Sequence, residues 1–175
     1  MKILIPMAGR GKRFEAAGYS FPKPLIDING KTMIQVIVEN LNFPAEHIFI
    51  CQKEHYENYS LKELLELISP KCKIIKVNEI TEGAACTALL AKELINNDEE
   101  LVIANSDQWI NWDNQHFLAF LRNSDADGGI VTFISTHPKW SFVKVNDEGE
   151  VTSLAEKKII SNIATVGIYY FKKGK

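Results

Sequence analysis

The chain has 175 residues and a formal net charge of −2, with 46% hydrophobic and 24% charged residues. This composition is ordinary for a soluble globular protein, and the length allows one domain with a substantial core. The small net charge argues against a general nucleic-acid binder, because non-specific binding to nucleic acid depends on an excess of Lys and Arg.

The sequence lacks the usual signals for export or membrane insertion. No apolar run approaches the roughly 18–20 residues of a membrane span, and the N-terminus has no signal-peptide pattern. Neither a zinc site nor a disulfide framework is indicated, because no C-x-x-C pair occurs among the three cysteines, Cys51, Cys72 and Cys86. We therefore expect a cytoplasmic protein that does not associate with a membrane.

Short apolar runs alternate with amphipathic segments, which predicts a layered α/β sheet. Strands are expected at residues 2–7, 47–52, 73–77, 101–104, 129–134, 142–145, 151–155 and 165–171. Helices are expected at residues 33–41, 58–68, 84–96 and 113–123. Asn29-Gly30 and Glu148-Gly149 are expected to form turns, the second of which would join two strands of a hairpin.

The order of these elements predicts two parts within one domain, residues 1–175. Three β–α units come first, as in a parallel sheet with crossover helices. After Asp127 the chain consists mostly of strands, so a mixed or antiparallel part is expected beside the parallel one.

A glycine-spaced basic loop follows the first predicted strand. Gly9 and Gly11 lack the side chains that would keep a ligand away from the backbone N–H groups of the loop. Positive charge is concentrated in and near this loop, at Arg10, Lys12, Arg13 and Lys23. The combination predicts a hollow that binds a triphosphate, and the alternative is a tight turn with solvated basic residues.

The loop differs from two well-known phosphate-binding motifs. The dinucleotide-binding fingerprint G-x-G-x-x-G needs a third glycine where this chain has Phe14. The P-loop G-x-x-x-x-G-K-[ST] needs Ser or Thr where this chain has Arg13. The loop is therefore interpreted together with the proline-flanked Lys23 and the residues further along the chain.

Three polar clusters lie beside predicted strands or helices. Asp107 follows a predicted central strand, where a carboxylate could hold Mg²⁺ or cap the next segment. Asn78, five residues before Gly83, could read a base edge, or the loop could simply lead into a helix. Glu156 and Lys157 could bind a substrate hydroxyl and phosphate, or could form a solvated turn.

Two weaker signals are the motif Asp125-Ala126-Asp127 and Trp140. The D-x-D spacing occurs in metal-dependent glycosyltransferases, but its position before two glycines favours a surface turn. Trp140 could form a wall of a substrate pocket or lie half-buried at a rim. The four histidines include no H-x-x-x-H pair, so the sequence gives little support to a histidine metal site.

Taken in order, these motifs resemble those of the sugar-phosphate nucleotidyltransferases, or nucleoside-diphosphate-sugar pyrophosphorylases. The resemblance covers nearly the whole chain, through residues 8–13, Pro22-Lys23-Pro24, Asn78 with Gly83, Asp107, Glu156-Lys157 and residues 165–169. It implies a Rossmann-like three-layer αβα fold with a mixed sheet, of the nucleotide-diphospho-sugar transferase type. It also implies a nucleotide-binding N-terminal half and an acceptor-binding part over residues 127–175.

The resemblance implies a reaction in which a small phosphorylated acceptor attacks an NTP and pyrophosphate leaves. The catalytic residues would be Arg13, at the leaving pyrophosphate, and Lys23, at the α-phosphate. The nucleotide would be bound by Met7, Ala8, Gly9, Arg10, Gly11, Lys12, Asn78 and Gly83. Mg²⁺, the implied cofactor, would be bound by Asp107, and the acceptor by Trp140, Ser141, Glu156 and Lys157.

The chain departs from the family pattern at two places. Family members supply a second metal-binding Asp near the end of the catalytic domain, and no residue after Tyr170 provides one, so we expect the usual C-terminal segment to be missing. Residues 104–107 replace the commoner G-D pattern and look more like a subgroup associated with capsule or lipopolysaccharide gene clusters. That subgroup would join CTP, UTP or dTTP to a sugar phosphate or another small phosphate.

Two other functions stay open at this point. A glycosyltransferase of the related fold would use Asp125 and Asp127 with a metal and would not need Lys23. A non-catalytic nucleotide-binding module would be consistent with a missing second Asp. The sequence also leaves open whether the chain forms a homo-oligomer, whereas nucleic acid is not an expected partner.

Overall fold

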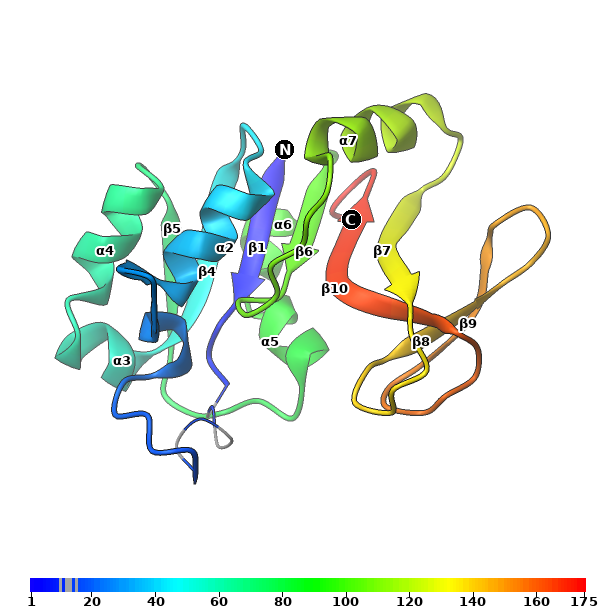
Figure 1. Cartoon of the computed structure of the whole chain (residues 1–175). Coiled ribbons are helices and arrows are strands. Elements are labelled where there is room, and N and C mark those ends of the chain that lie inside the picture. The colour runs from blue at the N-terminus through cyan, green and yellow to red at the C-terminus, as the bar shows by residue number, and fades with distance from the viewer. Residues whose placement is uncertain (10, 12–13, 15) are drawn as a thin grey trace.

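The computed structural model describes residues 1–9, 11, 14 and 16–175, and its centre is one mixed β-sheet (Figure 1). The described strands of this sheet run in the order β5-β4-β1-β6-β10-β8-β9, with β7 paired to β10. Their bounds are β1 Lys2–Pro6, β4 Glu46–Gln52, β5 Lys73–Val77, β6 Leu101–Ala104, β7 Gly128–Ile134, β8 Phe142–Val145, β9 Val151–Ala155 and β10 Ile163–Phe171. The described helices are α2 Met33–Leu41, α3 Lys53–Asn58, α4 Leu61–Ile68, α5 Ala84–Leu89, α6 Lys92–Ile95 and α7 Asn114–Asn123.

The first half of the chain forms the parallel part of the sheet. β1 lies between β4 and β6, and β5 lies beside β4, with all three pairings parallel. The register pairs Lys2 with Glu46 on one side and with Leu101 on the other. As the three predicted β–α units require, the C-terminal ends of these strands meet at one edge of the sheet.

The second half adds the antiparallel part, which confirms the predicted mixed sheet. β10 pairs antiparallel with β6, β7 and β8. β8 and β9 form an antiparallel hairpin whose turn contains Gly149 at a φ of 83°, as expected from the Glu148-Gly149 motif. The left-handed backbone conformation at this turn is one that glycine adopts without strain.

Helices cover both faces of the parallel part (Figure 1). Ile3 and Ile5 of β1 pack with α2, α4 and α7 on one face, because alternate side chains of a strand point to opposite faces. Leu4 packs with residues of α5 and α6 on the other face. This arrangement confirms the three-layer αβα architecture that the sequence predicts.

Local structure differs from the prediction in three segments. The expected helix 58–68 begins only at Leu61, and a separate helix, α3, precedes it because Ser60 adopts a left-handed φ of 47°. The expected helix 84–96 is divided into α5 and α6. At the division the N–H groups of Leu90 and Ala91 donate to the carbonyl three residues earlier, as in a 3₁₀ turn, rather than four residues earlier. Asn29-Gly30 is more than a turn, because it closes a small hairpin of β2 Asp27–Ile28 and β3 Lys31–Thr32.

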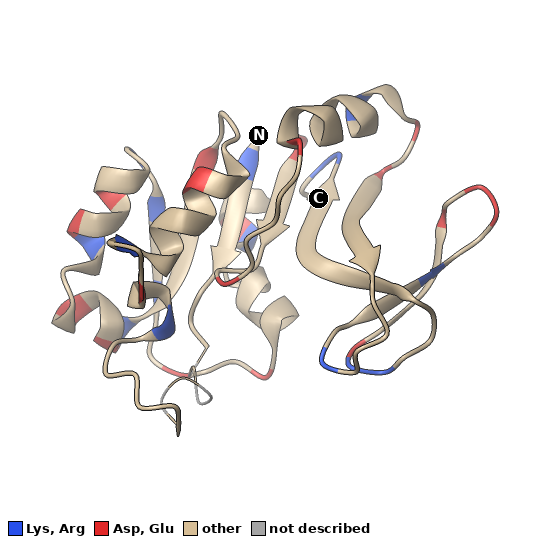
Figure 2. Cartoon of the chain, viewed as in Figure 1, with Lys and Arg blue, Asp and Glu red and all other residues tan. Residues whose placement is uncertain are grey.

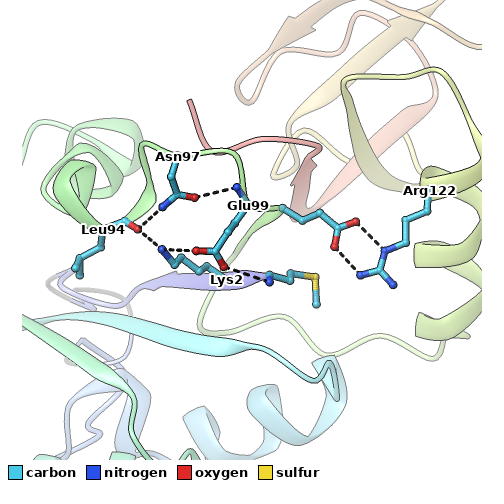
Figure 3. Close-up of polar contacts among 7 residues, drawn as sticks. Lys2, Leu94, Asn97, Glu99 and Arg122 are labelled. Atoms are coloured by element: carbon cyan, nitrogen blue, oxygen red, sulfur yellow. Dashed lines mark hydrogen bonds and ion pairs between the residues drawn. The ribbon is translucent and has the colours of Figure 1, made fainter.

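A network of charged side chains fastens the N-terminal edge of the parallel strands (Figure 3). Glu100 accepts hydrogen bonds from Arg122 Nε at 2.7 Å, Arg122 Nη2 at 2.5 Å and Tyr170 Oη at 2.8 Å. Lys2 Nζ lies 3.0 Å from a carboxylate oxygen of Glu99 and donates to the Leu94 carbonyl at 2.7 Å. The Arg122 guanidinium lowers the pKa of Glu100, and burial together with Glu100 raises the pKa of Tyr170 to about 12. The network joins β1, β6, α7 and β10 at the edge where β1 begins.

Within the part of the chain that the structure describes, no helix is both long enough and apolar enough to cross a membrane.

His47, at the start of β4, is a buried titratable residue with one unsatisfied nitrogen. Its Nδ1 lies 2.9 Å from Ser69 Oγ, and its ring stacks on Phe49 with centroids 5.8 Å apart. Its Nε2 has no hydrogen-bond partner among the described residues. Burial lowers the pKa of the imidazole to about 4, because the charged form would lose its hydration.

We expect acid to destabilise the fold through His47. The unfolded chain takes up a proton at this residue as the pH falls below the ordinary value of 6.5, whereas the folded chain resists protonation down to about 4. Over this window the free energy of unfolding should fall by about 3 kcal/mol from this residue alone. Urea unfolding between pH 7 and pH 4 should show a shallower pH dependence for His47→Gln than for the unmodified chain.

The matched control is His116→Gln, at an exposed position of α7. This variant should keep the pH dependence of the unmodified chain. Parallel curves for His47→Gln and the unmodified chain would contradict the prediction.

Candidate active site

The C-terminal edge of the parallel strands contains a hollow of about 270 Å³, lined by segments that follow β1 and β6 and by the short 3₁₀ helix η1, Lys23–Leu25. Its lining residues are Pro6, Met7, Gly9, Gly11, Lys23, Pro24, Asn105, Ser106 and Asp107. Open α/β sheets bind ligands at this edge, outside the carboxyl ends of the strands. The hollow therefore brings together the glycine loop, the proline-flanked lysine and the post-strand aspartate.

Lys23 is held in the hollow by the two prolines beside it. Pro22 is extended and accepts a hydrogen bond from Leu25 N–H at 2.8 Å, and Pro24 is buried in the first turn of η1. Lys23 Nζ forms an ion pair with Asp107 Oδ2, with 24% and 33% of the two side chains exposed. A phosphate that entered the hollow would compete for Lys23 and release the Asp107 carboxylate.

The glycine loop is held from below by Gln52, the last residue of β4. Gln52 Nε2 donates to the Ala8 carbonyl at 2.9 Å and reaches the Gly9 carbonyl at 3.4 Å. The Ala8 carbonyl and the Gly9 N–H belong to one trans peptide, so they point in opposite directions. The hydrogen bond from Gln52 to the Ala8 carbonyl therefore directs Gly9 N–H away from Gln52. Gly11 has a φ of 64°, and a Cβ there would lie 3.4 Å from Lys23 Cβ. No sequence motif pointed to Gln52; the available signal was a polar residue at the end of a buried strand.

The loop that carries Asp107 is seated on a bulge in β10. Asn105 N–H donates to the Gly167 carbonyl at 2.9 Å, and Asn105 Nδ2 donates to Gln108 Oε1 at 3.1 Å. Gly167 has a φ of 85°, and the register of β10 against β7 shifts around it. The motif at residues 165–169 contained this glycine, but nothing in the sequence showed that Asn105 and Gln108 lie against it.

Trp140 forms a wall of two further hollows beside Asp107. One, of about 380 Å³, is also lined by Asp107, Gln108 and Lys139. The other, of about 440 Å³, contains Gln108 and all three tryptophans of the chain, Trp109, Trp112 and Trp140. The Lys139 ammonium lies 4.4 Å from the centroid of the Trp140 ring. The two hollows share Gln108 and Trp140 as lining residues, and only the first of them is lined by Asp107.

Three predicted acceptor residues lie at the end of the β8–β9 hairpin. The pairing of Phe142 with Ala155 brings Ser141 next to Glu156. Glu156 and Lys157 form an ion pair with each other at 2.9 Å and are 74% and 57% exposed. They do not line the three hollows around Asp107. Figure 2 shows basic residues in the loops at this end of β8 and β9.

Asn78 and Gly83 lie in the exposed loop between β5 and α5, at the same edge of the sheet. Gly83 is the residue before the first turn of α5, and its carbonyl accepts from Thr87 Oγ1 at 3.1 Å. Neither residue lines the hollows around Asp107. Ala8 is buried beneath the loop. The remaining predicted residues, Arg10, Lys12 and Arg13, lie outside the described residues.

A divalent cation fits this site only with help from a ligand. Asp107 offers one carboxylate, and no group of three or more His, Cys, Asp or Glu residues is positioned to hold a metal in the described part of the chain. Mg²⁺ commonly uses one or two carboxylates together with substrate phosphates and water. Asp107 therefore fits a magnesium ion that would also be bound by phosphate oxygens of a ligand, and it does not fit an all-protein metal cage.

The D-x-D motif lies far from this edge. It precedes β7, whose first residue, Gly128, pairs with Phe171, and Phe171 pairs with Leu101 at the start of β6. Asp127 accepts a backbone hydrogen bond from Lys172 N–H at 2.8 Å through its carbonyl. Asp125 and Asp127 are therefore at the opposite edge of the sheet from Asp107.

Comparison with known proteins finds one family along nearly the whole chain. A family model described as nucleotidyl transferase matches residues 2–175. The bifunctional protein GlmU of Methanocaldococcus jannaschii is 28% identical over 177 residues, covering 99% of this chain and 40% of the relative. The catalytic subunit beta of mannose-1-phosphate guanylyltransferase from Dictyostelium discoideum is 28% identical, covering 98% of this chain and 49% of the relative. The chain thus spans less than half the length of these curated relatives.

A solved structure shows the same fold. The nucleoside-diphosphate-sugar pyrophosphorylase of Vibrio cholerae superposes with a TM-score of 0.77 at 26% identity, covering 98% of this chain and 73% of that chain.

We expect Gly167→Ala to destabilise the chain more than another glycine substitution at a similar φ. A Cβ at Gly167 would lie 2.1 Å from Asn105 Nδ2 and 2.4 Å from Gln108 Oε1. Gly149, with a φ of 83°, has nothing within 4 Å of its Cβ position. Chemical unfolding should show a loss of ~1 kcal/mol for Gly149→Ala and ~2–4 kcal/mol for Gly167→Ala. Equal losses would show that the contact with Asn105 and Gln108 does not matter.

Proposed function

The chain belongs to the nucleotidyl transferase family, and from this premise we propose that it joins an NTP to a sugar phosphate and releases pyrophosphate. The observation that carries the proposal is the pairing of Lys23 with Asp107 across the hollow that the glycine loop lines. A cation for phosphate and a carboxylate for a metal thus face the same space as the loop. In this proposal the N-terminal half of the chain binds the nucleotide and residues 127–175 bind the acceptor.

The proposed reaction needs positioning and charge neutralisation more than proton transfer. An oxygen of the acceptor phosphate attacks the α-phosphorus of the NTP, and pyrophosphate leaves from the opposite side. Because this oxygen is already anionic, no strong general base is needed. The backbone N–H groups of Gly9 and Gly11 hold phosphate oxygens, and Lys23 neutralises the negative charge that builds up at the α-phosphate. Arg13, outside the described residues, is assigned to the leaving pyrophosphate.

Asp107 would hold Mg²⁺ together with the phosphates of the nucleotide. When bound, the ion would neutralise phosphate charge and hold the phosphates in a fixed orientation. The chain's own contribution is the exchange of partners: Lys23 leaves Asp107 for a phosphate, and Asp107 becomes available as a ligand. The site thus keeps both charges compensated before and after the nucleotide binds.

The acceptor is assigned to the side of Asp107 where Trp140 lies. Lys139 and Trp140 line the hollow that begins at Asp107, and Ser141, Glu156 and Lys157 follow at the end of the β8–β9 hairpin. In this proposal Glu156 and Lys157 exchange their mutual ion pair for polar groups of the acceptor. Asn78 and Gly83, in the loop between β5 and α5, are assigned to the base.

We also propose which nucleotide is the donor and what biological role the reaction has. Residues 104–107 lack the commoner glycine–aspartate pair, which supports CTP, UTP or dTTP as the donor and surface-polysaccharide synthesis as the role. The test is pyrophosphate release with Mg²⁺, using five nucleotides (CTP, UTP, dTTP, GTP and ATP) and a panel of sugar 1-phosphates. Release that needs both substrates is the expected result. Nucleotide binding without release in any combination would favour a non-catalytic binding module.

We expect Lys23→Ala to abolish most turnover while the chain stays folded. Loss of one group that stabilises transition-state charge usually costs about 10²–10³ in rate. The control is Lys62→Ala, because Lys62 is an exposed lysine of α4 that pairs only loosely with Glu66, at 3.9 Å. Steady-state rates should fall for the first variant and stay unchanged for the second.

A second control distinguishes the proposed nucleotidyltransferase from a glycosyltransferase of the related fold. Asp127→Asn should leave pyrophosphate release unchanged, since this carboxylate is at the opposite edge of the sheet. Full turnover in Lys23→Ala together with a loss in Asp127→Asn would reject the nucleotidyltransferase proposal in favour of the alternative.

A further inference from the structure

Gln108 lies next to the metal-binding position and between two of the hollows, yet no sequence motif assigns it a role. We propose that Gln108 binds the phosphate group of the acceptor through its side-chain NH₂, and that Asn105 is a positioning residue that holds the amide in this orientation. The proposal rests on the proposed function, because it concerns the acceptor of that reaction.

The orientation of the Gln108 amide follows from its hydrogen bond with Asn105. Asn105 Nδ2 donates to Gln108 Oε1 at 3.1 Å, so the oxygen of the Gln108 amide points toward Asn105. The remaining group of that amide is Nε2, which carries two N–H donors and no acceptor. Gln108 therefore presents its two N–H donors on the side away from Asn105.

Asn105 is in turn held against β10. Its backbone N–H donates to the Gly167 carbonyl at 2.9 Å, and its side chain occupies the space that a Cβ at Gly167 would fill. The positive φ of Gly167 and the register shift in β10 make that close approach possible. The orientation of Gln108 thus depends on a strand about sixty residues further along the chain.

The hollow that Gln108 faces favours an anionic ligand group. Gln108 lines the space of about 380 Å³ together with Asp107 and Lys139. Lys139 carries a positive charge, and the carboxylate of Asp107 is compensated by Lys23. A phosphate oxygen only accepts hydrogen bonds, so it matches a donor-only NH₂ group beside an ammonium group.

The second hollow gives the rest of the acceptor a place. Gln108 also lines the space of about 440 Å³ that the three tryptophans enclose. A sugar phosphate bound at Gln108 could direct its phosphate toward Asp107 and its ring toward the tryptophans. Gln108 would then lie at the boundary between the reacting and non-reacting ends of the acceptor.

Two substitutions test the orientation of the Gln108 amide, one at Gln108 itself and one at its hydrogen-bond partner Asn105. Gln108→Glu keeps an oxygen that accepts from Asn105 but replaces the NH₂ group with a second carboxylate oxygen. Asn105→Asp can only accept, so Gln108 must turn its NH₂ group toward residue 105 and present its oxygen to the hollow. Both variants should weaken binding of a phosphate dianion by about 10- to 100-fold, because a donor becomes an acceptor.

The measurement is calorimetric titration with mannose 1-phosphate, glucose 1-phosphate and N-acetylglucosamine 1-phosphate, without nucleotide. Nucleotide affinity of Gln108→Glu should stay within twofold of the unmodified chain, and the thermal stability of both variants should stay within a few degrees of it. The control is Gln115→Glu, an exposed position on α7 that makes the same charge change. It should leave sugar-phosphate affinity unchanged.

Three results would overturn the proposal. They are unchanged sugar-phosphate affinity in Gln108→Glu, unchanged affinity in Asn105→Asp, or no sugar-phosphate binding by the unmodified chain. If Gln108→Met loses affinity while Gln108→Glu keeps it, residue 108 instead contacts a hydroxyl group of the sugar, because a hydroxyl can donate to a carboxylate. Because these are binding measurements, sugar-phosphate binding without pyrophosphate release would contradict only the proposed function.

Discussion

The parallel pairing of β1 with β4 and β6 is the constraint on which the site depends. β1 is central and its residues Ile3, Leu4 and Ile5 are fully buried, so its direction cannot change without loss of both core clusters. With all three strands parallel, the segments after β1, β4 and β6 emerge at one edge. Each segment contributes one part: the glycine loop, its support Gln52, and Asp107 with its neighbours.

The side chains that hold the site come from elsewhere in the chain. Gln52 supports the glycine loop from β4, and Gly167 in β10 supports the loop that carries Asp107. Lys23 reaches Asp107 across 84 positions of sequence. The geometry of each loop therefore depends in part on the neighbouring strands. Preorganisation of this kind lets the backbone N–H groups face a ligand without collapse of the hollow.

The two edges of the sheet carry different sets of charged residues. At the N-terminal edge Glu100 accepts hydrogen bonds from both Arg122 and Tyr170, and this cluster joins β10 and α7 to the start of β6. At the C-terminal edge Lys23 and Asp107 pair with each other, and in the proposed reaction a phosphate takes the place of Asp107 at Lys23. The D-x-D motif lies at the first edge, in the exposed segment between α7 and β7 and away from Asp107. The position of the motif along the chain did not reveal which edge of the sheet it occupies, whereas the direction of the neighbouring strands does.

The sequence by itself determined the local elements and the order of the motifs. Short apolar runs located the eight described strands of the main sheet to within about two residues, because the central strands are buried along most of their length. Only the tertiary structure decided the pairing of Lys23 with Asp107, the support of the glycine loop by Gln52 and the contact of Asn105 with Gly167. It also decided that a turn at Ser60 and a tightened turn at Leu90 interrupt the predicted helices. These features depend on strand order and close packing, which periodicity does not encode, because a pattern along the chain specifies which face a residue occupies but not which distant residue it meets.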